Sequence, residues 1–115
     1  MAYIDANVLA VPTARKDAYI AFAREVDPLF RECGALSVVD AWGDDVPEGK
    51  LTDYRRAVQA TADETVVLGW ITWPDKATRD AGWEKVMQDP RMQTFNPPFD
   101  GKRMIFGGFE VVVEV

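Results

Sequence analysis

The stretch from Glu64 to Met92 constrains the fold more than any other part of this 115-residue chain. Its first part, Thr65–Trp73, is rich in β-branched and aromatic residues, which favour a buried strand. Pro74 ends that strand because proline has no N–H to give to a sheet. Asp75 is a good N-cap for a helix, which Pro90 ends at about the preceding residue. The stretch therefore predicts a strand, a tight turn and a helix.

The N-terminal residues predict a second unit of the same kind. Tyr3–Val11 alternates as a strand does, with Ile4, Ala6, Val8 and Ala10 on one face and Tyr3, Asp5, Asn7 and Leu9 on the other. Thr13 is a suitable N-cap for the following helix, whose apolar residues recur at spacings of three and four. A further strand is expected at Leu36–Trp42.

Both predicted helices contain residues that affect their shape or packing. Pro28 predicts either a kink near Arg24–Asp27 or a break in which Asp27 caps a second short helix. Gly34 is a natural residue just past the helix end because it can adopt a positive φ. In the helix after Pro74, small residues allow close approach to a sheet and bulky residues form a second face: Ala77, Ala81 and Gly82 are small, and Trp83 and Met87 are bulky.

The remaining segments complete the order of elements. Gly43–Asp63 is irregular: its first part is a loop by composition, and Tyr54–Ala60 is either a short strand or a single helical turn. Arg103–Val115 predicts the final strand. The order favours an α+β fold, a ferredoxin-like sandwich with an antiparallel sheet and both helices on one face. At this length we expect one domain, residues 1–115.

Charge and hydropathy exclude several partners. Lys and Arg number 13 against 19 acidic residues, for a net charge of −6, which argues against nucleic acid and anionic membranes. No run of apolar residues is long enough to span a bilayer. The N-terminus lacks a basic region before its apolar part, and Cys33 is the single cysteine, so we expect a cytoplasmic protein without disulfides.

Histidine is absent, which removes the commonest catalytic acid–base and most zinc sites. The acidic loop Asp44–Gly49 lacks the spacing of an EF-hand, so we interpret it as a solvated turn. We therefore expect no metal site, and the sequence identifies no catalytic residue.

Polar residues inside apolar strands are the best site candidates. A solvent-facing or intersubunit position explains them without function, whereas a pocket would use them with two nearby tryptophans. The candidates for such a ligand-binding pocket are Asp5, Asn7, Asp40, Trp42, Trp70 and Glu110.

Four motifs resemble the YbaA-like bacterial family, whose function is unassigned. They are WGDDVPEGKLTDY at Trp42–Tyr54, ETVV with the following W and WP.K at Glu64–Lys76, RDAG.EKVM.DPRM at Arg79–Met92, and PFDGKRMI.GGFEV at Pro98–Val111. The resemblance covers nearly the whole chain and implies a subunit of a dimeric α/β barrel. That group includes cofactor-independent monooxygenases and haem-degrading enzymes.

Haem-degrading members of that group use an Asn on the first strand, a Trp on the third and a His on a helix. This chain has Asn7 and Trp70 in comparable places but no His, so we expect no haem and no other cofactor. We also expect a homodimer, because both faces of the final strand carry large apolar side chains and one sheet face needs a cover.

Three functions remain open, and whether the chain is an enzyme is undecided. The first is a homodimer that binds an uncharged or cationic small molecule on the sheet. The second is a cofactor-independent oxygenase acting on an aromatic substrate, with Asn7 orienting it and Asp5 or Asp40 accepting a proton. The third is a stress-related module that binds another protein through the Gly43–Tyr54 loop.

Overall fold

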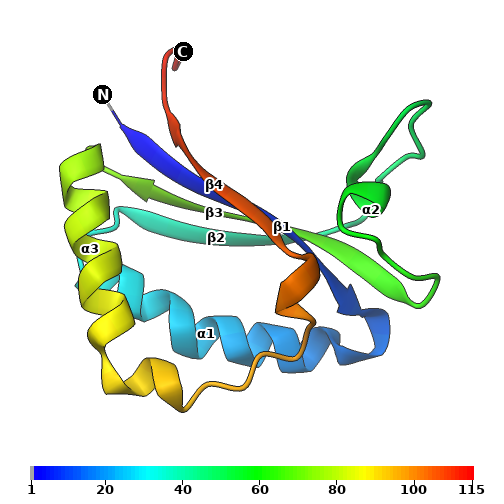
Figure 1. The fold of residues 1–115 in the computed structure, drawn as a ribbon, viewed down its shortest axis with the longest axis horizontal. Helices are drawn as coiled ribbons and strands as arrows, with labels where there is room; N and C mark the ends of the chain where they lie inside the picture. The colour runs from blue at the N-terminus through cyan, green and yellow to red at the C-terminus, as the bar shows by residue number, and fades with distance from the viewer. Residues whose placement is uncertain (1) are drawn as a thin grey trace.

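The structure, a computed structural model, describes residues 2–115. Its four strands form one antiparallel sheet in the order β2-β3-β1-β4. The strands are β1 (Tyr3–Pro12), β2 (Ser37–Trp42), β3 (Glu64–Trp73) and β4 (Ile105–Glu110). The two long helices, α1 (Lys16–Glu32) and α3 (Lys76–Gln88), lie on the same side of the sheet (Figure 1).

Four short helical segments complete the chain. They are η1 (Thr13–Arg15), α2 (Tyr54–Ala57), η2 (Pro90–Gln93) and η3 (Gly101–Arg103). The α2 segment and the loop before it project at one end of the sheet, away from α1 and α3 (Figure 1). The predicted α+β, ferredoxin-like architecture is therefore confirmed.

The predicted start and end of α3 and the predicted end of α1 are confirmed. Asp75 caps α3, and its carboxylate accepts a hydrogen bond from the N–H of Thr78 at 2.7 Å. The helix ends at Gln88, one residue before Asp89 and two before Pro90. Gly34 has the expected positive φ, at 115°, just past the end of α1.

Two details of the first helix differ from the prediction. Thr13 does not cap α1, because it opens η1 and its hydroxyl pairs with that of Thr65 at 2.7 Å. The break at Pro28 is also wrong, since α1 continues to Glu32. Buried residues on both sides of Pro28, Val26, Leu29 and Phe30, hold the helix against the core.

The structure decides between the two alternatives for one segment and shortens the predicted final strand. Of the alternatives for Tyr54–Ala60, the helical turn is correct: Asp53 caps α2 by accepting from the N–H of Arg56. The final strand, predicted over Arg103–Val115, covers only Ile105–Glu110, and Arg103 belongs to η3 instead. Beyond Glu110 the chain has β propensity but no strand beside it, because β1 begins at Tyr3 and the ladder ends there.

The register of the strands divides the sheet into two faces. The helix face, toward α1 and α3, carries Asp5, Asn7 and Leu9 of β1, and Gly69 and Ile71 of β3. The open face carries the alternate residues, among them Ile4, Ala6, Trp70, Ile105 and Phe109.

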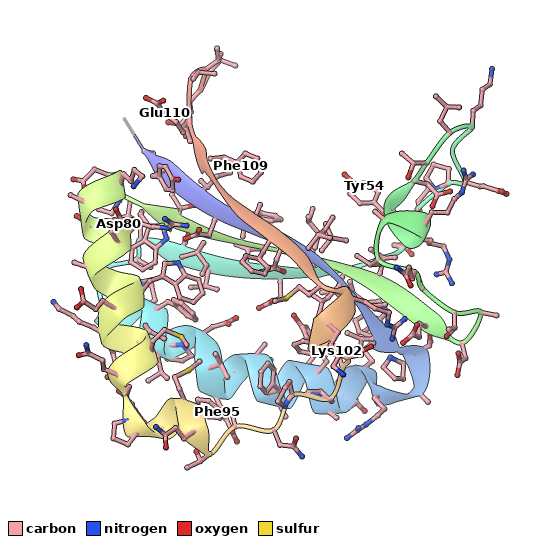
Figure 2. All side chains as sticks on the ribbon, viewed as in Figure 1. Tyr54, Asp80, Phe95, Lys102, Phe109 and Glu110 are labelled. Carbon is pink, nitrogen blue, oxygen red and sulfur yellow. The ribbon has the colours of Figure 1, made fainter. Side chains whose placement is uncertain are left out.

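One end of the open face is covered by the α2 segment. Val58, fully buried, packs there against Val8, Ala10 and Val66. The other end stays exposed, and Figure 2 shows Phe109 pointing from β4 away from the two long helices.

An ion pair ties η3 to β3. Arg103 donates to both carboxylate oxygens of Glu64 at 2.7 Å and to the carbonyl of Gln59 at 2.8 Å. Hydrogen bonding to Arg103 lowers the pKa of the buried Glu64 to about 2. This pair anchors the segment leading into β4, which borders the cavity described next.

A cavity between the first helix and the sheet

A cavity of about 340 Å³ lies between α1 and the helix face of the sheet. Its walls are mostly apolar and aromatic, and α3 and the segment before β4 complete them. The aromatic side chains that border it are Tyr19, Phe22, Phe30, Trp83, Phe99 and Phe106. Its polar groups are few: Asp5 and Asn7 of β1, Asp27 of α1 and Asp40 of β2.

The carboxylate of Asp5 accepts hydrogen bonds from three side chains. Its Oδ2 accepts from the indole N–H groups of Trp73 at 2.9 Å and Trp83 at 2.7 Å. Arg79 donates to the same carboxylate through Nε and through Nη2, the latter at 2.7 Å. These four N–H donors and the paired charge of Arg79 use both oxygens of the carboxylate, so Asp5 fastens α3 to β1.

Asn7 lies next to Asp5 on the same face, with its amide against Gly69. A Cβ at Gly69 would come within 2.8 Å of the Oδ1 of Asn7, so a larger residue at position 69 would displace this amide. The Oδ1 is buried and has no hydrogen-bond partner within residues 2–115. The amide is thus the uncommitted polar group on the cavity's sheet side.

Asp40, Tyr19 and Asp27 form the polar group at the α1 side. The hydroxyl of Tyr19 donates to the Oδ1 of Asp40 at 2.8 Å. Burial and the adjacent Asp40 raise the pKa of the Tyr19 hydroxyl well above its usual range. Burial, and then hydrogen bonding to and repulsion by Asp40, raise the pKa of Asp27 to about 8. At neutral pH Asp27 is therefore mostly protonated.

An outer groove of about 630 Å³ adjoins this cavity between α1 and β2. Four residues border both spaces, and we call them the neck: Tyr19, Asp27, Val38 and Asp40. The outer groove also carries basic residues of α1, and the Nζ of Lys16 lies 5.5 Å from the ring centroid of Trp42. Asp40 itself is exposed, so solvent reaches the acidic pair from the groove.

The structure brings three of the six site candidates together. Asp5, Asn7 and Asp40 border the same cavity, whereas Trp42 borders the outer groove and not this cavity. Trp70 is in register with Ala6 on the open face, so it borders the cavity only through the backbone of β3. Glu110 is exposed at the end of β4 opposite Tyr3 and lies outside the cavity lining.

Asn7 pairs with Gly69, so Asn7 and Trp70 occupy opposite faces of the sheet. The residues that sequence reasoning missed are Tyr19, Asp27 and Gly69. A signal existed for Gly69, because a lone glycine inside a strand often marks the close approach of another group.

Neither a metal-binding cluster of side chains nor a membrane-spanning helix occurs in the part of the chain that the structure describes. Residues 2–115 contain no group of three His, Cys, Asp or Glu side chains that could hold a metal ion. In the same part of the chain, no helix is both long and apolar enough to cross a membrane.

Comparison with known proteins settles the family. Residues 2–101 match the family model described as "Protein of unknown function (DUF1428)". The chain belongs to the DUF1428 family. Among curated members, the uncharacterised protein YbaA of Escherichia coli K12 is 53% identical over 116 residues, covering 99% of each chain. YbaA of Shigella flexneri matches to the same extent.

Solved structures share the fold of this DUF1428 chain. A dimeric ferredoxin-like protein from an uncultured marine organism superposes with a TM-score of 0.60 at 12% identity, covering 99% of this chain and 98% of the other. An uncharacterised NIPSNAP domain protein from Burkholderia xenovorans gives a TM-score of 0.59 at 13% identity, with 96% and 94% covered. Identities this low carry the fold alone.

Proposed function

We propose that this protein binds a small, uncharged or cationic molecule in the cavity between α1 and the sheet. The observation that carries the proposal is a hollow of about 340 Å³ with aromatic walls and an uncommitted amide at Asn7. Ligand sites of small molecules are typically concave, mostly apolar and equipped with a few polar groups. Anionic ligands are disfavoured because the titratable side chains bordering the cavity are all acidic or tyrosine within the described residues.

A ligand screen with a cavity-filling variant tests the proposal. We expect hits from a fragment library of neutral and cationic aromatics to raise the melting temperature of the wild type, because they bind only the folded state. Val38→Phe adds bulk at the neck and should abolish those shifts. Ile20→Phe adds an aromatic ring to the outer groove alone and should preserve them.

The outcomes separate the two spaces. Hits that disappear in Ile20→Phe and persist in Val38→Phe would place the ligand in the outer groove. A library that shifts neither the wild type nor Ile20→Phe would contradict the proposal.

We also propose that the binding unit is a homodimer that pairs through the open face. Apolar side chains of β4 remain uncovered on this face, where Ile105 and Phe109 are both about half exposed. A patch of this kind is rarely left in water by a monomer, and a two-fold axis lets one patch serve both copies. The marine protein of the same fold is described as dimeric, which supports a dimer as the assembly state.

Phe109→Asp is expected to convert the dimer to a monomer, because it places a charge in the proposed interface. Light scattering on a size-exclusion column should give twice the chain mass for the wild type and the single chain mass for the variant. Phe106→Asp is the matched control: Phe106 is 78% exposed on the same strand but belongs to the helix face, so its variant should stay dimeric. A monomeric, well-folded wild type would contradict this assembly.

A further inference from the structure

The charged side chains that border the cavity, among the described residues, are all acidic. Within residues 2–115, the acidic groups that border it are Asp5, Asp27 and Asp40, and no Lys or Arg borders it. The charge of Asp5 is already neutralised by Arg79, which donates to it at 2.7 Å. The acidic pair at the neck, Asp27 and Asp40, is thus the cavity's uncompensated charge.

Aromatic rings stand next to that pair. Tyr19, Phe22 and Phe99 form a triangle with ring centroids 6.3, 6.0 and 5.8 Å apart, and all three border the cavity. Aromatic faces attract cations, and groups of them are a common solution for ammonium recognition. This arrangement is independent of the carboxyl groups and favours the same sign of charge.

We infer that the cavity accepts an ammonium compound with an apolar body, its nitrogen at the neck beside Asp27 and Asp40 and its body among the aromatic rings. The inference rests on the proposed ligand-binding function and specifies the ligand's chemical class. The size of the cavity suits a compound of one ring and a short or branched ammonium group.

Binding of such a cation is linked to a proton. The pKa of Asp27 is raised to about 8, so Asp27 is mostly protonated at pH 6.5 and mostly ionised at pH 9. A cation stabilises the ionised form, so its affinity rises with pH through this range. The groups facing Asp27 are Asp40 from β2 and Tyr19 from α1, while Lys16, Arg24 and Arg31 of α1 border only the outer groove.

Two isosteric probes separate charge from shape. Phenyltrimethylammonium carries a permanent charge at every pH, and tert-butylbenzene has the same shape without it. By isothermal titration calorimetry or tryptophan fluorescence, we expect the wild type to bind the cation about tenfold more tightly than the neutral probe at pH 9. The affinity for the cation should fall about tenfold between pH 9 and pH 6.5, the change that accompanies a one-unit shift in the pKa of Asp27 on binding.

Variants assign the effect to the neck. Asp27→Asn mimics the protonated side chain, so it should remove the pH dependence and keep the affinity measured at pH 6.5. The double variant Asp27→Asn/Asp40→Asn should remove the preference for the cation, because it removes both carboxylates of the neck. Glu25→Gln removes the same charge from an exposed position on α1 outside both spaces, and it should behave as the wild type. Near-ultraviolet circular dichroism checks that each variant is folded.

The outcomes distinguish this inference from the proposed function. Equal affinity for the two probes at pH 9, or a preference for the cation that survives in the Asp27→Asn/Asp40→Asn double variant, overturns the ammonium inference. If Val38→Phe abolishes binding of both probes in that case, the cavity remains the ligand site. Failure of both probes to bind overturns the inference, and the fragment screen then decides the proposed function by itself.

Discussion

Replacement of Asp5 by alanine is expected to lower the free energy of unfolding by about 3–5 kcal/mol, the usual cost of removing one partner of a buried ion pair. The variant leaves the guanidinium of Arg79 without its carboxylate in a mostly buried position. It also leaves the indole N–H groups of Trp73 and Trp83 without their acceptor. Four hydrogen bonds from two elements meet at this one side chain, so the loss loosens β1, β3 and α3 together.

Urea unfolding at one fixed protein concentration measures the effect, since the stability of a dimer depends on its concentration. The control is Asp80→Ala, because Asp80 also accepts from Arg79, at 3.0 Å, but is exposed. That variant should cost less than about 1 kcal/mol, as exposed ion pairs do. Similar losses for the two variants would show that the Asp5 network contributes no more than a surface pair.

Sequence reasoning identified Asp5 as a residue in need of partners but could not name them. The partners lie 68, 74 and 78 residues along the chain, at Trp73, Arg79 and Trp83. Their meeting depends on the register of β1 with β3 and on the path of α3 across the sheet. Local propensity determines neither the register nor this path, so the network cannot be predicted from the sequence.

The element order, by contrast, follows from local signals. Pro74 and Asp75 mark a strand end and a helix start, and each acts over a few residues. The prediction of β4 failed at its C-terminal end because strand propensity in residues 111–115 needs a neighbouring strand to be realised. Propensity describes one chain segment, whereas a ladder requires two.

The neck was predicted in part for a similar reason. Asp40 stands out in the sequence because it interrupts an apolar strand, whereas Asp27 reads as an ordinary polar residue of a helix. Its raised pKa arises from burial and from Asp40 on another element, and packing of α1 over β2 creates both. The sequence thus indicates Asp40 as a member of the acidic pair but gives no sign of Asp27.

Trp73→Ala is expected to lower the free energy of unfolding by about 3–5 kcal/mol, the range for truncating a buried tryptophan. Trp73 is fully buried at the end of β3 and packs edge-on against Phe30 with ring centroids 6.5 Å apart. A Cβ at Gly82 would come within 2.5 Å of its ring, so α3 approaches the strand closely only because residue 82 is glycine. The other small residues of that helix, Ala77 and Ala81, are exposed and take no part in this contact.

Trp73→Phe separates packing from hydrogen bonding at the same site. It keeps an aromatic ring between Phe30 and Gly82 but removes the N–H that donates to Asp5. We expect this variant to unfold at a urea concentration between those of the wild type and Trp73→Ala, measured by circular dichroism. A cost below about 1 kcal/mol for Trp73→Ala would be that of a surface residue. In that case Trp73 would not join β3 to α3, and the wall of the cavity formed by Trp83 would have to be held by the carboxylate of Asp5 and the ring of Phe30.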